Sequence, residues 1–144
     1  MDTNRDDVRR RFCGPHLPTT VRRRLPDTLK GIESATTDFL RAADDLIRDV
    51  NLRSAERVWM SSRTAWSLMF PYRRSVLQND PALLDAFRAA VGRVRDALGT
   101  EQRAEGEFFE YLRGDLSRRE SLLDALLAEN SETRIRELLA AERD

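Results

Sequence analysis

Apolar residues recur every three or four positions through most of the chain, which is the spacing of one face of an α-helix. The pattern is regular from Asp27, a residue type that caps helix N-termini, to Val50. The expected inward face consists of Leu29, Ile32, Phe39, Leu40, Ala43, Leu46, Ile47 and Val50. These positions predict an amphipathic helix over residues 27–50.

The most apolar segment covers residues 53–70 and predicts a second helix. One face carries Ala55, Trp59, Ser62, Trp66 and Met69, and the apolar surface is extended by Val58, Ala65, Leu68 and Phe70. A helix that is apolar over more than half of its circumference is typically central in a fold. We therefore expect this helix to be the central one, with its aromatic side chains in the core. Pro71 has no amide hydrogen to donate to residue 67, so the helix is expected to kink or end there.

The next helix has clear signals at both ends. Asp80 offers a capping side chain, and Pro81 suits the first helical position. Gly99 is the residue type that commonly follows the last turn of a helix. Apolar residues repeat at helical spacing between these signals, so a helix is predicted over residues 81–98.

The segment 100–129 admits two interpretations. In the first, Thr100 begins a helix that Gly114 ends, and Ser117 with Glu120 forms a capping box that begins another helix. In the second, one long helix runs through Gly114. A final short helix is predicted after Asn130, and its length is marginal for stability in isolation, so we expect it to pack on another surface.

No segment alternates apolar and polar residues over the length of a β-strand, and no repeat of about 20 to 50 residues is present. The chain is therefore predicted to be all-α, a single-domain compact bundle of six to seven helices with the apolar helix 53–70 at its centre. Residues 27–144 are assigned to this bundle. Residues 1–26 are predicted to form a basic N-terminal arm or leader, whose helix-breaking residues are Gly14, Pro15, Pro18 and Pro26.

The composition fits a bundle with charged outer faces. Of the 144 residues, 40% are hydrophobic, too many for a disordered chain, and 35% are charged, above the ~25% of average domains. The first residues have no apolar signal core, and the uncharged run 64–72 in the most apolar segment is far shorter than the ~20 residues that span a bilayer. A single cysteine cannot close an internal disulfide. We therefore expect a cytoplasmic protein without membrane contact.

Charge is distributed unevenly, although the formal net charge is zero. Residues 1–26 and 53–78 each carry +4, residues 27–52 carry −3, and residues 100–144 carry −5. Arginine supplies nearly all of the positive charge, and its planar guanidinium suits both carboxylate and phosphate groups. The candidate contacts to a partner or to phosphate are Arg9, Arg10, Arg11, Arg22, Arg23, Arg24, Arg57, Arg63, Arg73 and Arg74.

Cys13 and His16 are the only cysteine and histidine of the chain, and together they supply half of a zinc site. A structural zinc ion takes four such ligands, so we assign these two residues no metal role. The sequence has no HExxH, Glu-x-x-His, glycine-rich phosphate loop or G-x-S-x-G motif. No catalytic residue, metal ligand or cofactor is predicted, and the chain is not expected to be an enzyme.

These observations favour a non-enzymatic helical interaction module, such as an adaptor, an inhibitor or an assembly subunit. It would act through contacts with a protein partner or as a homo-oligomer. The alternative is a nucleic-acid-binding subunit whose arginines contact the phosphate backbone without reading sequence. The zero net charge and the absence of a recognisable reader motif count against this alternative.

Overall fold

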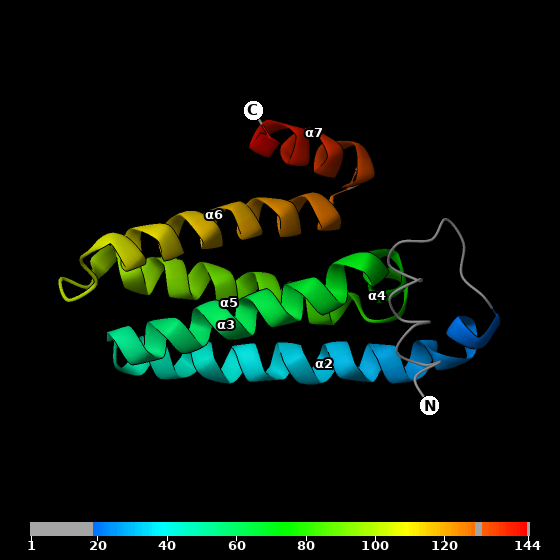
Figure 1. Cartoon of the computed structure of the whole chain (residues 1–144), viewed down its shortest axis with the longest axis horizontal. Coiled ribbons are helices and arrows are strands. Elements are labelled where there is room, and N and C mark those ends of the chain that lie inside the picture. The colour runs from blue at the N-terminus through cyan, green and yellow to red at the C-terminus, as the bar shows by residue number, and fades with distance from the viewer. Residues whose placement is uncertain (1–18, 129–130, 144) are drawn as a thin grey trace.

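The computed structural model describes residues 19–128 and 131–143, which are helical almost throughout and contain no β-strand (Figure 1). The predicted all-α class is confirmed. In chain order the elements are α2 (Thr19–Arg48), α3 (Leu52–Met69), the 3₁₀ turn η1 (Phe70–Tyr72), α4 (Arg73–Asn79), α5 (Pro81–Thr100), α6 (Glu107–Leu127) and α7 (Ser131–Arg143).

The long helices lie side by side as two stacked hairpins (Figure 1). α2 packs on α3 in the first hairpin, and α5 packs on α6 in the second. Contact between α2 and α5 joins the hairpins, whereas the backbones of α3 and α6 approach each other at few positions. α7 packs on the outer side of α6 (Figure 1).

The core lies between the two hairpins and contains most of the residues expected there. Phe39 of α2 meets Phe87 of α5 with 5.1 Å between their ring centroids. Ile47 differs from the prediction, because it remains 39% exposed. The largest fully buried side chains are Ile32, Phe39, Leu46, Met69, Leu84, Phe87, Leu98, Leu112, Leu116, Leu123, Leu126 and Ile135.

Two predicted helix boundaries are confirmed. The Asp80 side chain accepts a hydrogen bond from the amide of Leu83 at 3.3 Å, and Pro81 follows at the first position of α5. At Pro71, α3 gives way to the 3₁₀ turn η1, and α4 begins immediately after it. Proline cannot donate the hydrogen bond that would continue α3, which accounts for the change.

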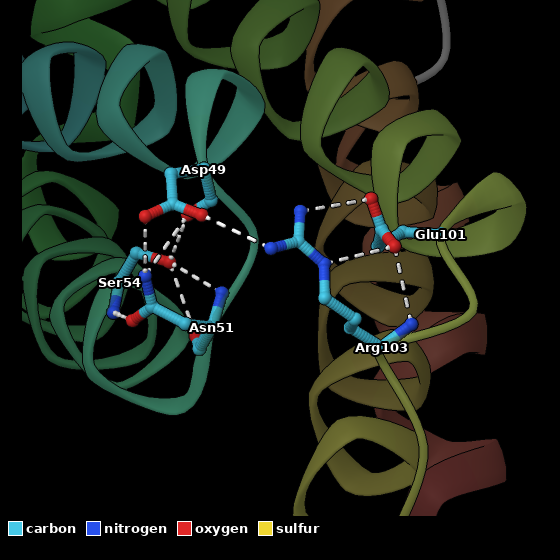
Figure 2. Close-up of polar contacts among 5 residues, drawn as sticks. All are labelled: Asp49, Asn51, Ser54, Glu101 and Arg103. Carbon is cyan, nitrogen blue, oxygen red and sulfur yellow. Dashed lines mark hydrogen bonds and ion pairs between the residues drawn. The ribbon is translucent and has the colours of Figure 1, made fainter.

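Short polar side chains hold the turn between α2 and α3 (Figure 2). Asn51 Oδ1 accepts a hydrogen bond from the Ser54 amide at 2.9 Å, and Ser54 Oγ accepts one from the Asn51 amide at 3.1 Å. Arg103, from the loop between α5 and α6, donates to both Glu101 and Asp49, with 3.4 Å between its Nη1 and Asp49 Oδ1. The bond from Arg103 to Asp49 therefore links the connection of one hairpin to the connection of the other.

The start of the first helix was not predicted correctly. α2 begins at Thr19, so Asp27 is not an N-cap and Pro26 lies inside the helix. The φ angle of proline is compatible with a helix, and its presence removes one backbone hydrogen bond without ending this one.

One helix, and not two, covers most of the segment 100–129, so the second interpretation of this segment is the correct one. Thr100 is the last residue of α5, and Gly106, with φ 112° and ψ 168°, is the residue that precedes α6. Gly114 lies within the helix. A helical glycine costs about 1 kcal/mol relative to alanine, less than the burial of a single leucine contributes.

Two further features of the predicted architecture require correction. Within the described residues, five helices have at least 13 residues, so the prediction of six to seven is slightly high, because residues 107–127 form one helix. α3 is not central either. It packs mainly on α2, and its outer face is exposed at Arg57, Met60, Arg63, Thr64, Ser67 and Leu68. Ser61, Thr64 and Ser67 interrupt the apolar surface on that side, which explains why this helix covers the bundle from outside.

Candidate interaction surface on helix α3

The predicted arginines do not converge on one basic surface within the part of the chain that the structure describes. Arg57 and Arg63 are exposed on α3, whereas Arg73 and Arg74 are bound to Glu132 of α7. The side chains outside the described part include those of Arg9, Arg10, Arg11, Cys13, His16, Arg22, Arg23 and Arg24.

Glu132 is the centre of a clamp that holds α7. Arg73 binds both carboxylate oxygens of Glu132, each at 3.1 Å, and also donates to the Phe70 carbonyl oxygen at 2.9 Å. Arg74 Nε lies 3.4 Å from Glu132 Oε1. The hydrogen bonds from Arg73 lower the pKa of Glu132, so its carboxylate form is favoured. These arginines therefore have a structural partner already.

The outer face of α3 combines exposed apolar side chains with arginines that lack ionic partners. Met60 is 62% exposed and Leu68 is 41% exposed. Arg57 and Arg63 form no ion pair with any residue that the structure describes. Exposed apolar groups rimmed by polar ones are typical of protein interaction sites.

A cavity of about 420 Å³ lies between α2 and α3 beside this face. Its lining includes the small side chains of Ala35 and Ala42. Ser61 and Thr64 donate their hydroxyl hydrogens to backbone carbonyl oxygens of α3, at 2.7 and 3.0 Å, so these polar groups are already satisfied. The charged residues of the lining are Asp38, Arg41, Asp45 and Arg57. Small side chains between two helices allow a third helix to approach closely.

The opposite flank of α3 is filled by aromatic side chains at its contact with α6. Trp59 meets Phe108 and Tyr111 edge to face, with 6.1 and 6.3 Å between centroids. The Arg63 guanidinium lies over Trp59 at 5.0 Å, and that of Arg119 lies over Trp66 at 5.2 Å. The Trp59 indole N–H is buried and has no acceptor. Bulky rings thus fill a gap that the two backbones leave open.

Asp115 and Arg119 form a buried ion pair on α6, facing α3. The Asp115 side chain is 3% exposed and the Arg119 side chain 7%. Asp115 Oδ1 accepts hydrogen bonds from Arg119 at 3.2 Å and from Arg118 at 2.6 Å. Burial lowers the pKa of Arg119, Asp115 acts in the opposite direction, and the positive charges of Arg118 and Arg63 lower it further. Asp115 is therefore the buried counter-charge of Arg119 at this contact.

The described residues contain no group of three His, Cys, Asp or Glu side chains that could hold a metal ion. Among the same residues, no helix is both long enough and apolar enough to cross a membrane.

The sequence interpretation missed Met60 and the Asp115–Arg119 pair. Met60 is apolar on the polar side of its helix, and that mismatch was an available signal. Asp115 and Arg119 lie at i, i+4 in the same stripe as Leu122 and Leu126, which marks them as inward-facing. Treating Gly114 as a helix end concealed that stripe.

Comparisons with protein families, curated proteins and solved structures gave no match to this chain.

Proposed function

We propose that the chain is a non-enzymatic interaction module that binds an amphipathic helix of a partner protein in the groove between α2 and α3. The observation that carries the proposal is Met60, which is 62% exposed beside a cavity of about 420 Å³. Methionine is flexible and polarizable, and it is used often at surfaces that adapt to a partner's side chains. Burial of Met60 would contribute to the affinity.

The charges around the groove favour a partner helix with a carboxylate beside its apolar stripe. Arg57 lines the groove and has no ionic partner among the described residues, so a carboxylate of the partner can bind it. Helix-in-groove recognition of this kind uses apolar anchors at helical spacing. The small side chains of Ala35 and Ala42 leave room for one such anchor.

The same charges argue against a nucleic acid in this groove. Asp38 and Asp45 line it together with Arg41 and Arg57, and their carboxylates repel phosphate. Arg73 and Arg74, which a phosphate-binding surface would use, are bound to Glu132. A protein partner therefore fits this groove better.

The proposal is tested by site-specific photocrosslinking in a native lysate of the source organism. A benzophenone amino acid is placed at position 60 in one sample and at position 89 in another, because Ala89 is exposed on α5 and does not line the groove. We expect a protein adduct at position 60 that is absent at position 89. The adduct is identified by mass spectrometry, and its affinity for the purified chain is then measured by calorimetry.

Met60→Glu should weaken the purified complex about tenfold, since burying a charge in the groove is unfavourable, while Ala89→Glu should leave it unchanged. Unchanged affinity in Met60→Glu overturns the proposal. So does a position-60 adduct that consists only of nucleic acid, or of a second copy of this chain.

A further inference from the structure

Arg73, at the start of α4, is held in position by its own segment of the chain. Its Nη1 donates to the Phe70 carbonyl oxygen at 2.9 Å, and its guanidinium lies over the Phe70 ring at 4.3 Å. Neither contact involves α7. The other two donors of the guanidinium, Nε and Nη2, bind the two carboxylate oxygens of Glu132 at 3.1 Å each. Arg73 therefore offers a preformed fork that matches a carboxylate.

The helix that supplies this carboxylate is attached by few contacts. α7 has 13 residues, a length that is marginal for an isolated helix, and it packs on the outer side of α6 (Figure 1). Ile135 is buried, Leu138 and Leu139 are partly buried against the core, and the other described side chains of α7, apart from Glu132, are exposed. The side chains of Arg73 and Glu132 are 23% and 26% exposed, so solvent partly screens the pair.

We propose that α7 is an autoinhibitory occupant of a second helix-binding site, and that a helix of a partner protein displaces it from Arg73 and α6. The chemistry of the partner helix follows from α7 itself. Glu132 lies in the first turn, Ile135 follows three residues later, and leucines follow six and seven residues later. A carboxylate in the first turn also stabilises the helix that carries it. The site is separate from the groove between α2 and α3, and the inference does not rest on the function proposed for that groove.

The tether between α6 and α7 favours a partner helix over exchange of α7 between two copies of the chain. α6 ends at Leu127 and α7 begins at Ser131, so α7 docks within its own chain. A short tether is equivalent to a free helix at about millimolar concentration. The α7 of a second copy makes the same contacts and does not compete at micromolar concentration. A partner helix with a longer apolar stripe adds contacts to α6 and does compete.

The test is an NMR titration of the full ¹⁵N-labelled chain with an unlabelled peptide that has the sequence of residues 129–144. Because only the chain is labelled, the signals of its own α7 report displacement directly. We expect saturable shifts, with Ile135 and Leu138 of the chain losing their helical chemical shifts as the peptide takes their place. Signals of Ala42, which lines the groove between α2 and α3, should not change.

Three variants of the labelled chain separate this site from non-specific binding. Glu132→Gln should bind the peptide about fivefold more tightly than the wild-type chain, since its own α7 is held less firmly while Arg73 is intact. Arg134→Gln is the matched control on the same helix, because its pair with Glu137 is exposed, and its affinity should change less than about twofold. Arg73→Gln removes the clamp from the chain's own α7 and from the peptide alike, so its affinity should also change less than about twofold.

The proposal fails if Glu132→Gln shows no saturable binding, or if the α7 signals stay helical while the peptide binds. It also fails if Arg73→Gln gains as much affinity as Glu132→Gln, because the peptide then does not use Arg73. A mass of two chains in light scattering of the free chain would assign the site to a second copy and reject a partner helix. Met60→Glu should bind the peptide as the wild-type chain does, so this test is separable from that of the groove.

Discussion

Two glycines, one just before α6 and one within it, have opposite structural requirements. Gly114 lies in the middle of α6, and a Cβ added there would meet no atom within 4 Å. Gly106 precedes the helix with φ 112° and ψ 168°, a conformation that is open essentially to glycine alone. The same substitution should therefore have opposite signs at these positions.

Gly114→Ala is expected to raise the free energy of unfolding by about 1 kcal/mol, since alanine loses less backbone entropy in a helix. Gly106→Ala should lower it by about 1–3 kcal/mol because of backbone strain. Urea denaturation followed by circular dichroism measures both. A stabilising effect of Gly106→Ala would contradict the conformation assigned to the start of α6.

The buried pair on α6 gives a second prediction at the residue scale. Asp115→Asn leaves the guanidinium of Arg119 buried without its counter-charge, which should destabilise the fold by about 3 kcal/mol. Asp124 on the same helix is the control, because its side chain is 55% exposed although it forms an ion pair with Arg88. Asp124→Asn should cost less than about 1 kcal/mol. Equal losses of unfolding free energy in the two variants, measured by chemical denaturation, would show that the buried Asp115–Arg119 pair contributes no more than an exposed pair does.

At the scale of elements, the sequence predicted what depends on local spacing. Apolar periodicity identified the helical class, and Asp80-Pro81 and Pro71 marked real boundaries because capping and the missing proline amide act within one helical turn. The failures at Pro26, Gly99 and Gly114 share one cause. Each residue disfavours a helix locally, by about 1 kcal/mol for glycine and about 3 kcal/mol for proline, and the fold as a whole outweighs that cost. Local sequence does not show the tertiary contacts that decide this.

The candidate site was less predictable than the helices. Arg57 and Arg63 were identified from their residue type, and Arg73 and Arg74 were grouped with them because Glu132 is far away in the sequence. Which arginine is satisfied inside the fold depends on contacts between distant elements. Nothing in the local sequence separates these two pairs.

The clamp at the start of α7 gives a pH-dependent prediction. The pKa of Glu132 is lower in the folded chain than its ordinary value of 4.5, chiefly through the hydrogen bonds from Arg73. The clamp therefore contributes stability that is fully present above the ordinary pKa and is lost as the pH falls through the lowered one. Glu132→Gln should cost about 1 kcal/mol at neutral pH.

Urea denaturation of the wild-type chain and of Glu132→Gln over a range of pH checks this prediction. The difference between the wild-type chain and Glu132→Gln should be constant at neutral pH and shrink towards zero in acid. Arg134→Gln is a suitable control, since Arg134 forms an exposed pair with Glu137 within α7 itself. A difference that persists in acid would mean that the glutamine disturbs packing and not charge.

For the whole molecule, the opposing charges of the sequence segments are partly neutralised inside the fold. The acidic segment 27–52 is bound by later arginines, through Asp44 to Arg93 and through Asp49 to Arg103. The acidic C-terminal segment binds Arg73 and Arg74 through Glu132. Among the exposed arginines that retain no ionic partner in the described chain are Arg57 and Arg63 of α3, and Arg57 lines the groove proposed for a partner helix.

The position of α7 allows a last prediction about the whole molecule. α7 packs on α6 outside the two hairpins, and Ile135 is its only residue in the fully buried class among the described side chains. Removing residues 129–144 should therefore leave a folded bundle, destabilised by about 2 kcal/mol or more from the lost burial of Ile135. The apolar surface exposed on α6 should promote self-association. Circular dichroism melting and light scattering measure these effects, with Ile135→Ala as a milder comparison. Loss of cooperative unfolding in the shortened chain would show that α7 is an integral part of the core.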